Sequence, residues 1–239
     1  MRKSIKVLVM LFLFLINFFS AQVRDFVIEP PLGKKLYLYK TFGVFDGREY
    51  STNALYLVTK KGVVLFDVPW QKSQYQSLMD TIKKRHDLPV IAVFATHSHA
   101  DRAGDLSFYN NKGISTYATS KTNELLKKEG KAISNKIIKV GKKYKIGGEE
   151  FTVDFLGEGH TVDNVVVWFP KYNVLDGGCL VKSMSATDLG YTGEANVKEW
   201  PLTMKKLKAK YPASAKVIPG HDEWKGNDHV KHTLELLNH

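Results

Sequence analysis

The stretch that most constrains this chain is an apolar run of strand length, followed at once by side chains that bind metals. Val90–Phe94 contains only apolar residues, which is typical of a strand buried on both faces. His97, His99 and Asp101 follow at positions i, i+2 and i+4, and alternate residues of an extended chain point the same way. Two imidazoles and a carboxylate that converge in this way suit Zn²⁺. The alternative is a polar strand end whose histidines bond only to water.

Three further candidate ligands each follow a glycine. His160 lies within the sequence GEGHT, Cys179 within GGCL and His221 within PGHD. A glycine before each ligand lets the backbone bend sharply and approach a common centre closely. A lone histidine is more often an ordinary polar residue, but the six residues together predict a metal centre built from separate loops.

Four other histidines lie outside this pattern: His86, His229, His232 and His239. They occur in a polar loop or along the last expected helix. His229 and His232 could share one face of that helix. We expect surface histidines here rather than a second metal site.

Periodicity indicates a mixed α/β layered fold. Strands are expected at residues 35–42, 54–59, 62–66, 90–96, 165–169, 173–175 and 216–218, with a hairpin over 144–155. Helices are expected at 71–85, 103–109, 120–129, 197–211 and near the C-terminus. Residues 43–48 carry a turn signal at Asp46-Gly47 beside Phe45. That phenylalanine either acts as a flap or folds onto the core.

The N-terminus reads as a secretory signal peptide over residues 1–21. Arg2, Lys3 and Lys6 precede an apolar run at 7–16, and Ala21 offers a cleavage position. The run is too short for a spanning helix, and no other stretch is apolar enough. We therefore expect export to the periplasm, no membrane anchor, and a single domain over residues 22–239 that is monomeric.

The cysteine count and the net charge restrict which functions are compatible with the chain. Cys179 is the only cysteine, so it cannot form an internal disulfide, and metal ligation explains a lone cysteine in an exported chain. The formal net charge of +11 falls to +8, 32 basic against 24 acidic residues, once the three N-terminal cations are removed. The basic residues are scattered along the chain, which favours a solvated surface over nucleic-acid binding.

From about Val23 to the C-terminus, the chain resembles the metallo-β-lactamases. The motifs HSHADRAG, GEGHTVDNVVVWFP, GGCLVKS and IPGHDEW carry the resemblance. They point to the subclass with three histidines at one zinc and Asp-Cys-His at the other, and to the IND-type carbapenemases within it. The resemblance implies an αββα sandwich with two Zn²⁺ at one edge. The wider superfamily usually has histidine where this chain has Arg102, which fits the cysteine-ligand subclass.

The resemblance also assigns individual roles. It implies that one zinc is held by His97, His99 and His160, and the other by Asp101, Cys179 and His221. It implies that Lys182 pairs with the carboxylate of a bicyclic β-lactam, whereas the alternative is a plain surface lysine. Many relatives carry asparagine where this chain has Tyr191, so polarisation of the lactam carbonyl would pass to zinc or to the backbone.

These observations predict an exported hydrolase that opens β-lactam rings, carbapenems included, and so confers antibiotic resistance. A zinc-bound hydroxide attacks the lactam, Asp101 orients this hydroxide, and the loop of Phe45 closes over the apolar side of the substrate.

Two alternatives are a zinc hydrolase of the same fold that acts on another ester or amide, and a non-catalytic protein that binds nucleic acid or an envelope polymer. Cys179 and Lys182 disfavour the first, and the complete ligand set disfavours the second.

Overall fold

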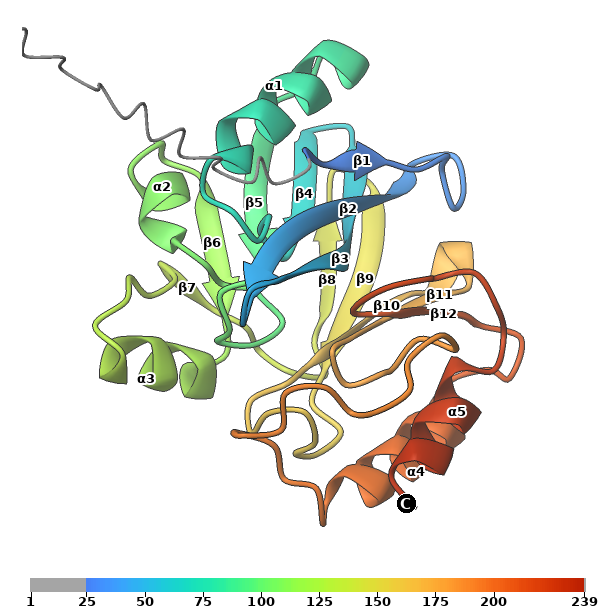
Figure 1. Cartoon of the computed structure of the whole chain (residues 1–239). Coiled ribbons are helices and arrows are strands. Elements are labelled where there is room, and N and C mark those ends of the chain that lie inside the picture. The colour runs from blue at the N-terminus through green and yellow to red at the C-terminus, as the bar shows by residue number, and fades with distance from the viewer. Residues whose placement is uncertain (1–24, 239) are drawn as a thin grey trace, which may run out of the picture.

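Two β-sheets form the centre of the structure, which is a computed structural model that describes residues 25–238 (Figure 1). The first sheet has the strand order β1-β2-β3-β4-β5-β6-β7. Strands β1 to β4 are antiparallel, and β4 to β7 are parallel. Its strands are β1 (Val27–Ile28), β2 (Leu36–Phe45), β3 (Arg48–Thr59), β4 (Gly62–Phe66), β5 (Val90–Phe94), β6 (Ser115–Ala118) and β7 (Lys136–Ile137).

The second sheet has the order β12-β11-β10-β9-β8. Strands β8 to β11 are antiparallel, and β12 is parallel to β11. Because β9 and β11 both run antiparallel to β10, the carboxyl ends of β9, β11 and β12 meet at one edge. The strands are β8 (Lys143–Ile146), β9 (Glu149–Asp154), β10 (Val166–Phe169), β11 (Val174–Gly178) and β12 (Lys216–Pro219).

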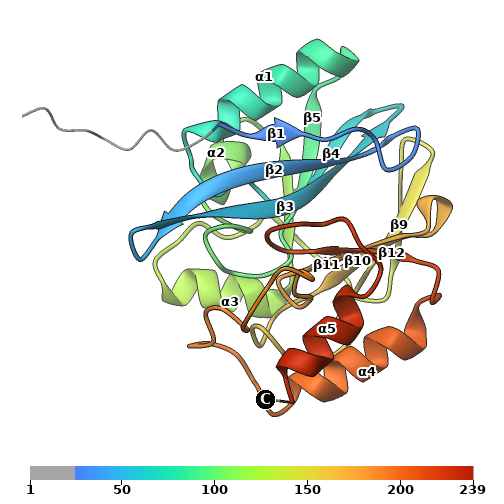
Figure 2. The ribbon, with the colours of Figure 1, turned by 45° about the vertical axis from the view of Figure 1, so that its right-hand side comes forward.

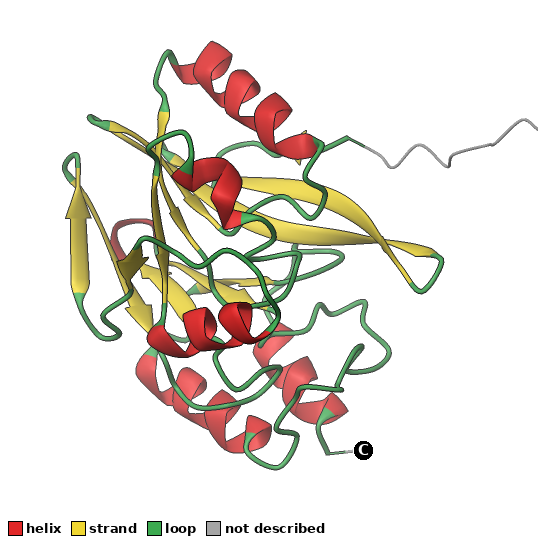
Figure 3. Ribbon diagram, turned by 90° about the vertical axis from the view of Figure 1, so that its left-hand side faces the viewer, coloured by secondary structure: helices red, strands yellow, loops and turns green. Residues whose placement is uncertain are grey.

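Helices cover the outer faces of the two sheets (Figures 2 and 3). One buried cluster joins the first sheet to α1, α2 and α3, and another joins the second sheet to α4 and α5. A third cluster lies between the sheets. The predicted four-layer αββα sandwich is therefore confirmed. The helices are α1 (Gln74–His86), α2 (Leu106–Asn110), α3 (Ser120–Lys128), α4 (Trp200–Lys210) and α5 (His229–Leu236), with a short 3₁₀ helix at Pro170–Tyr172.

Apolar side chains that point alternately to the two faces of the central strands explain why both faces of the first sheet are buried. In β4, Val63 and Leu65 face the helices, while Val64 and Phe66 face the second sheet. Successive side chains of a strand point to opposite faces, so a wholly apolar strand needs cover on both sides. Phe66 packs edge-on against Phe169 of the second sheet, with ring centroids 4.8 Å apart. This contact fixes how the sheets face each other.

The expected elements are present, with several differences at their boundaries. Residues 43–48 are not a separate loop, because β2 and β3 continue to a turn at Asp46-Gly47. The positive φ angles at both turn residues, 48° and 71°, permit this tight hairpin. Helix α4 begins at Trp200, where Pro201 suits the first turn, rather than at Val197. The short strands β1, β6 and β7 were not predicted, and two of them, β1 and β7, have only two residues each, too few to show periodicity.

The N-terminal segment predicted as a signal peptide, residues 1–21, lies outside the described residues. Within residues 25–238, no helix is both long and apolar enough to cross a membrane. The boundaries predicted for the mature domain, 22–239, stay a prediction.

Candidate metal centre

Four short segments bring the six predicted ligands to one edge of the sandwich. His97, His99 and Asp101 lie in the turn that follows β5. His160 follows β9 across a short loop, and the remaining two ligands, Cys179 and His221, come directly after β11 and β12. The carboxyl ends of these strands meet at this edge, and for that reason residues more than a hundred positions apart converge.

Glycine is required where two of these loops meet. A Cβ atom on Gly220 would lie 2.6 Å from the backbone nitrogen of Cys179, closer than real Cβ contacts. Gly178 has φ of 51°, a left-handed conformation that disfavours other residues. These two glycines allow the Cys179 and His221 loops to approach each other.

The three predicted ligands of the first zinc form one histidine cluster. The ring centroids of His97, His99 and His160 lie 4.7–5.1 Å apart. Nε2 of His160 lies 3.2 Å from Nδ1 of His99, and tetrahedral zinc places two nitrogen ligands about 3.3 Å apart. Nε2 of His97 is buried without a hydrogen-bond partner in the described chain. An orphaned buried nitrogen beside two converging imidazoles fits a metal ion.

The other three residues form a second, more mixed group. Sγ of Cys179 lies 3.1 Å from Nε2 of His221 and 3.6 Å from Oδ2 of Asp101. That same nitrogen of His221 lies 3.5 Å from Oδ2 of Asp101. Sulfur, nitrogen and oxygen ligands of one tetrahedral zinc are separated by roughly 3.3–3.6 Å, so this group also fits.

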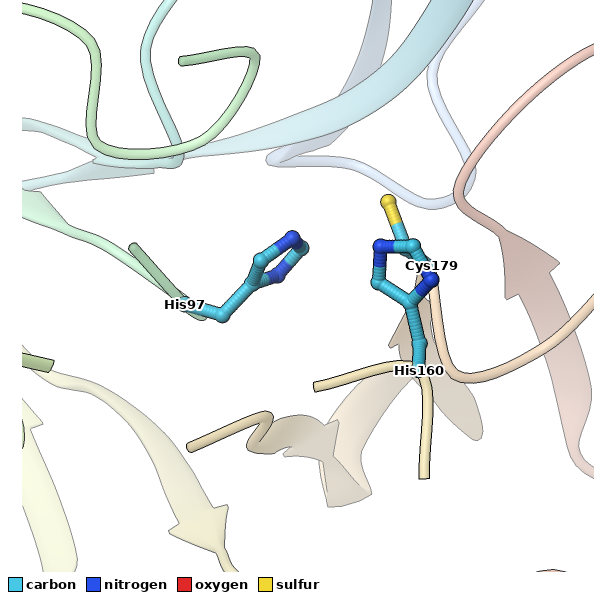
Figure 4. Close-up of side chains that lie close together, drawn as sticks. All are labelled: His97, His160 and Cys179. Carbon is cyan, nitrogen blue, oxygen red and sulfur yellow. The ribbon is translucent and has the colours of Figure 1, made fainter. Parts of the chain in front are cut away.

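The two groups adjoin each other. His97, His160 and Cys179 also have ligand atoms within 4.8 Å of one another, although they come from different predicted sites. Figure 4 shows His97 reaching across from the end of β5 toward the other two side chains. The centre is therefore one continuous lining of nitrogen, oxygen and sulfur atoms. The division of the six residues into two triads stays a prediction.

Burial sets the protonation states that a metal would meet. It lowers the pKa of both His97 and His160 well below the usual value, so the rings are neutral and can donate a lone pair. Burial also raises the pKa of the Cys179 thiol. Burial opposes ionisation of Asp101 as well, but the charge of the adjoining Arg102 guanidinium outweighs it, and the pKa of Asp101 is lowered to about 2. A bound cation would supply the positive charge that a Cys179 thiolate needs.

Arg102 is the residue that ties this centre to the fold, and sequence analysis did not identify that role. Its side chain is 0% exposed. Nε donates to Oδ2 of Asp101 at 2.8 Å, and Nη1 donates to Oδ2 of Asp67 at 3.2 Å. The remaining donors reach the carbonyls of Asn53, at 2.8 Å, and Gly220, at 2.6 Å. One guanidinium thus joins β3, the turn after β4, the ligand Asp101 and the loop of His221.

Asp67 could have been found from the sequence. It directly follows the apolar run of β4, in the same way that the predicted ligands follow their strands. Its Oδ1 accepts a hydrogen bond from the backbone nitrogen of Thr96 at 2.7 Å, next to His97. No comparable local signal marks Arg102 as buried.

The β2–β3 hairpin holds His221 in place. Nδ1 of His221 donates to the carbonyl of Ser51 at 2.9 Å, which leaves Nε2 free to face Cys179. A hydrogen bond of this kind fixes the tautomer and orientation of a ligating histidine. Asn53 reinforces the contact, because its side chain donates to the carbonyl of Pro219 at 2.9 Å.

The two predicted substrate residues differ in their burial and in their contacts. Lys182 is 9% exposed, and its ammonium sits 5.3 Å from the ring centroid of Trp200. Burial lowers the pKa of Lys182. Phe45 is half exposed at the hairpin tip and packs edge-on against Tyr191 at 5.8 Å. Tyr191 in turn packs on His99 at 5.9 Å, so the hairpin reaches the metal centre.

The prediction of a surface position is wrong for His229. Its side chain is buried, Nδ1 accepts from the backbone nitrogen of Met184, and Nε2 donates to the carbonyl of Trp224, both at 3.1 Å. These bonds fasten α5 to two loops, a role that helical periodicity alone does not reveal. His232 is partly buried against the carbonyl of Ala186, at 2.8 Å. His86 bonds with the Tyr56 hydroxyl at 3.1 Å, and His239 lies outside the described residues.

An αββα sandwich whose edge is lined by histidines, a carboxylate and a thiol is typical of a class of metal-dependent hydrolases. Comparison with known proteins places the chain in that class. Residues 47–221 match the profile of the metallo-beta-lactamase superfamily. The chain is 75% identical over 238 residues to metallo-beta-lactamase IND-1 of Chryseobacterium indologenes, covering 100% of this chain and 99% of that protein. It is 43% identical over 223 residues to metallo-beta-lactamase type 2 of Elizabethkingia meningoseptica, covering 93% and 89%.

Solved structures give the same result. The crystal structure of metallo-beta-lactamase IND-7 matches with a TM-score of 0.89 at 78% identity, covering 91% of this chain and 100% of that one. A metallo-beta-lactamase from Pontibacter korlensis matches with a TM-score of 0.85 at 32% identity, covering 90% and 99%. The chain therefore belongs to the metallo-β-lactamases, which are zinc-dependent hydrolases. The resemblance to this family that its motifs indicated is confirmed.

The Arg102 network predicts a large loss of stability when the guanidinium is removed. Arg102→Ala leaves the carboxylates of Asp67 and Asp101 buried without a counter-charge, which costs about 3–5 kcal/mol. Urea unfolding of the metal-free protein measures this loss. Arg48→Ala, at the exposed end of the hairpin, is the matched control and should shift the free energy of unfolding by less than about 0.5 kcal/mol. Equal effects of the two substitutions would contradict the role given to Arg102.

Proposed function

We propose that this chain is an exported di-zinc enzyme that opens the amide bond of β-lactam antibiotics, carbapenems included, and so confers resistance. The observation that carries the proposal is the pair of adjoining ligand groups at one edge of the sandwich. The high identity to a metallo-beta-lactamase over the whole chain supports the substrate class. Export to the periplasm rests on the signal-peptide pattern of residues 1–21, and the mature enzyme acts as a monomer without a membrane anchor.

Each predicted ligand has a place in this proposal. His97, His99 and His160 hold one zinc, and Asp101, Cys179 and His221 hold the other. When bound, zinc supplies a Lewis acid for the lactam carbonyl and lowers the pKa of water toward neutrality. The neutral imidazoles, and Nε2 of His97 that lacks a hydrogen-bond partner, support the first zinc site. The short distances from Sγ of Cys179 to His221 and to Asp101 support the second.

Asp101 orients the attacking water and is not a covalent nucleophile. Its low pKa keeps the carboxylate ionised at neutral pH, so it accepts a hydrogen bond and offers no proton. Arg102 holds this carboxylate in one orientation through its 2.8 Å hydrogen bond. A fixed acceptor beside the nucleophile lowers the cost of reaching the attack geometry.

The substrate is positioned by two residues that do not bind metal. The Lys182 ammonium attracts the carboxylate of a bicyclic β-lactam, since it adds a fixed positive charge close to the ligands. Phe45 covers the apolar side of the substrate from the hairpin tip. Its half-exposed ring and its contact with Tyr191 support that position. Tyr191 stands where many relatives carry a carbonyl-polarising asparagine, so this polarisation would pass to zinc or to the backbone.

Carbapenem hydrolysis by the purified enzyme, with and without a chelator, tests the function. We expect turnover that falls to background when metal is removed and returns when zinc is added, because no nucleophilic serine or cysteine acts in the proposed mechanism. Activity that survives complete metal removal would contradict the mechanism. A zinc-loaded enzyme that hydrolyses other amides or esters but no β-lactam would contradict the substrate class.

Cys179→Ser tests the second zinc site. Serine replaces a soft, charged ligand with a hard and weakly acidic hydroxyl, so the second zinc binds much more weakly while three histidines still hold the first. We expect a folded protein with reduced zinc content and impaired hydrolysis, partly recovered at high zinc. Val181→Thr introduces a buried hydroxyl two residues away and should cost only about 1–3 kcal/mol in stability. Full zinc occupancy and normal turnover in the serine variant would remove Cys179 from the site.

Lys182→Glu tests whether Lys182 binds the carboxylate of the substrate. Reversing the charge replaces attraction with repulsion, and the loss should appear mainly in KM because ground and transition states both keep the carboxylate. Lys198→Glu makes the same charge change on an exposed lysine and should leave kcat/KM nearly unchanged. If kcat/KM for a carbapenem is unchanged in the Lys182 variant, the lysine does not bind the carboxylate.

A further inference from the structure

The segment that links α3 to β8 is unusually basic. Residues 127–145 contain eight lysines and a single acidic residue, Glu129. Sequence analysis treated the basic residues as scattered, but the fold gathers this group. The segment passes through β7, the edge strand of the first sheet, and ends in β8, the edge strand of the second sheet. The five lysines from β7 to β8 therefore lie along the side of the sandwich where both sheets end.

A cavity of about 350 Å³ opens between these two edge strands. Two tyrosines, Tyr117 and Tyr144, contribute to its lining, and lysine ammonium groups lie over their rings. The ammonium of Lys136 is 5.3 Å from the centroid of Tyr117, and that of Lys142 is 5.7 Å from the centroid of Tyr144. The five lysines that line the cavity are Lys136, Lys139, Lys142, Lys143 and Lys145.

Three of the cavity lysines are left without a counter-charge. Lys143 and Lys145 share the carboxylate of Glu150, at 3.5 and 3.4 Å. Across residues 25–238, no carboxylate lies within ion-pair distance of the other three lysines. Because these three are exposed and close together, the cavity carries a net positive charge that an external anion can neutralise.

The same segment also exposes apolar side chains. Ile133, Ile137 and Val140 are 45%, 47% and 50% exposed, and Ile137 lines the cavity itself. A free inorganic anion gains nothing from exposed aliphatic groups. A lipid surface offers both anionic headgroups and an apolar boundary, so it matches both features.

We propose that residues 127–145 form a docking surface for an anionic phospholipid membrane. The uncompensated lysines contact the headgroups, while Ile137 and Val140 enter the boundary above the acyl chains. Nucleic acid fits less well, because the faces of Tyr117 and Tyr144 are already covered by ammonium groups and cannot stack on bases. None of the residues that line the cavity belongs to the metal centre.

Vesicle sedimentation of the exported holoenzyme tests the proposal. We expect binding to vesicles of phosphatidylglycerol and phosphatidylethanolamine, weakening with added salt, and little binding to phosphatidylcholine alone. The double variant Lys139→Glu/Lys142→Glu should lower the partition coefficient at least about tenfold. The double variant Lys205→Glu/Lys206→Glu on α4 carries the same charge change away from the cavity and should bind nearly as wild type.

The contribution of exposed aliphatic side chains to vesicle binding gives a second, independent test. Val140→Ser should weaken binding severalfold at high salt, where charge is screened, whereas Leu202→Ser on α4, which removes a 48% exposed side chain, should not. Unchanged hydrolysis by all these variants shows that they are folded. Equal losses in the two lysine variants would overturn the proposal, since net charge alone would then explain binding. Release from vesicles by a few millimolar inorganic phosphate, or tighter binding to single-stranded DNA than to vesicles, would overturn it too.

Discussion

The buried guanidinium of Arg102 is the contact on which the metal centre depends. It neutralises the carboxylates of Asp67 and Asp101 and bonds to two backbone carbonyls, one in β3 and one beside His221. A planar fork of donors can satisfy several acceptors at fixed angles, which an ammonium cannot do. The same group therefore orients a ligand from the first sheet and places a ligand loop from the second. A histidine at this position could not make all of these contacts.

The rest of the centre follows from strand direction and loop geometry. The strands that precede the ligands all end at one edge, so short loops are enough to bring their side chains together. Close packing of the two sheets through Phe66 and Phe169 fixes the separation of these loops. A buried imidazole nitrogen without a hydrogen-bond partner, such as Nε2 of His97, is costly in the metal-free protein. Metal binding compensates this cost, so zinc affinity and folding stability are coupled.

The clustering of the six predicted ligands could be anticipated from sequence because each carries a local signature: a strand, then glycine or an alternating polar pattern, then a side chain that can bind metal. Periodicity predicted only a mixed α/β layered protein, and the αββα sandwich was implied by the resemblance to a known family. Residues that act through long-range contacts could not be predicted. Arg102 reads as an ordinary charged residue in a loop, and His229 reads as part of a polar helix face. Their burial is set by segments far away in the sequence, such as Asn53 and Trp224.

The central claim is that six side chains divide into two zinc sites, and anomalous scattering at the zinc edge from crystals of the loaded enzyme tests it most directly. The account predicts two peaks. One should lie about 2.0–2.1 Å from nitrogens of His97, His99 and His160, and the other should lie about 2.3 Å from the sulfur of Cys179, in contact with Asp101 and His221. A single peak shared by His97, His160 and Cys179, which also lie within reach of one another, would contradict the account.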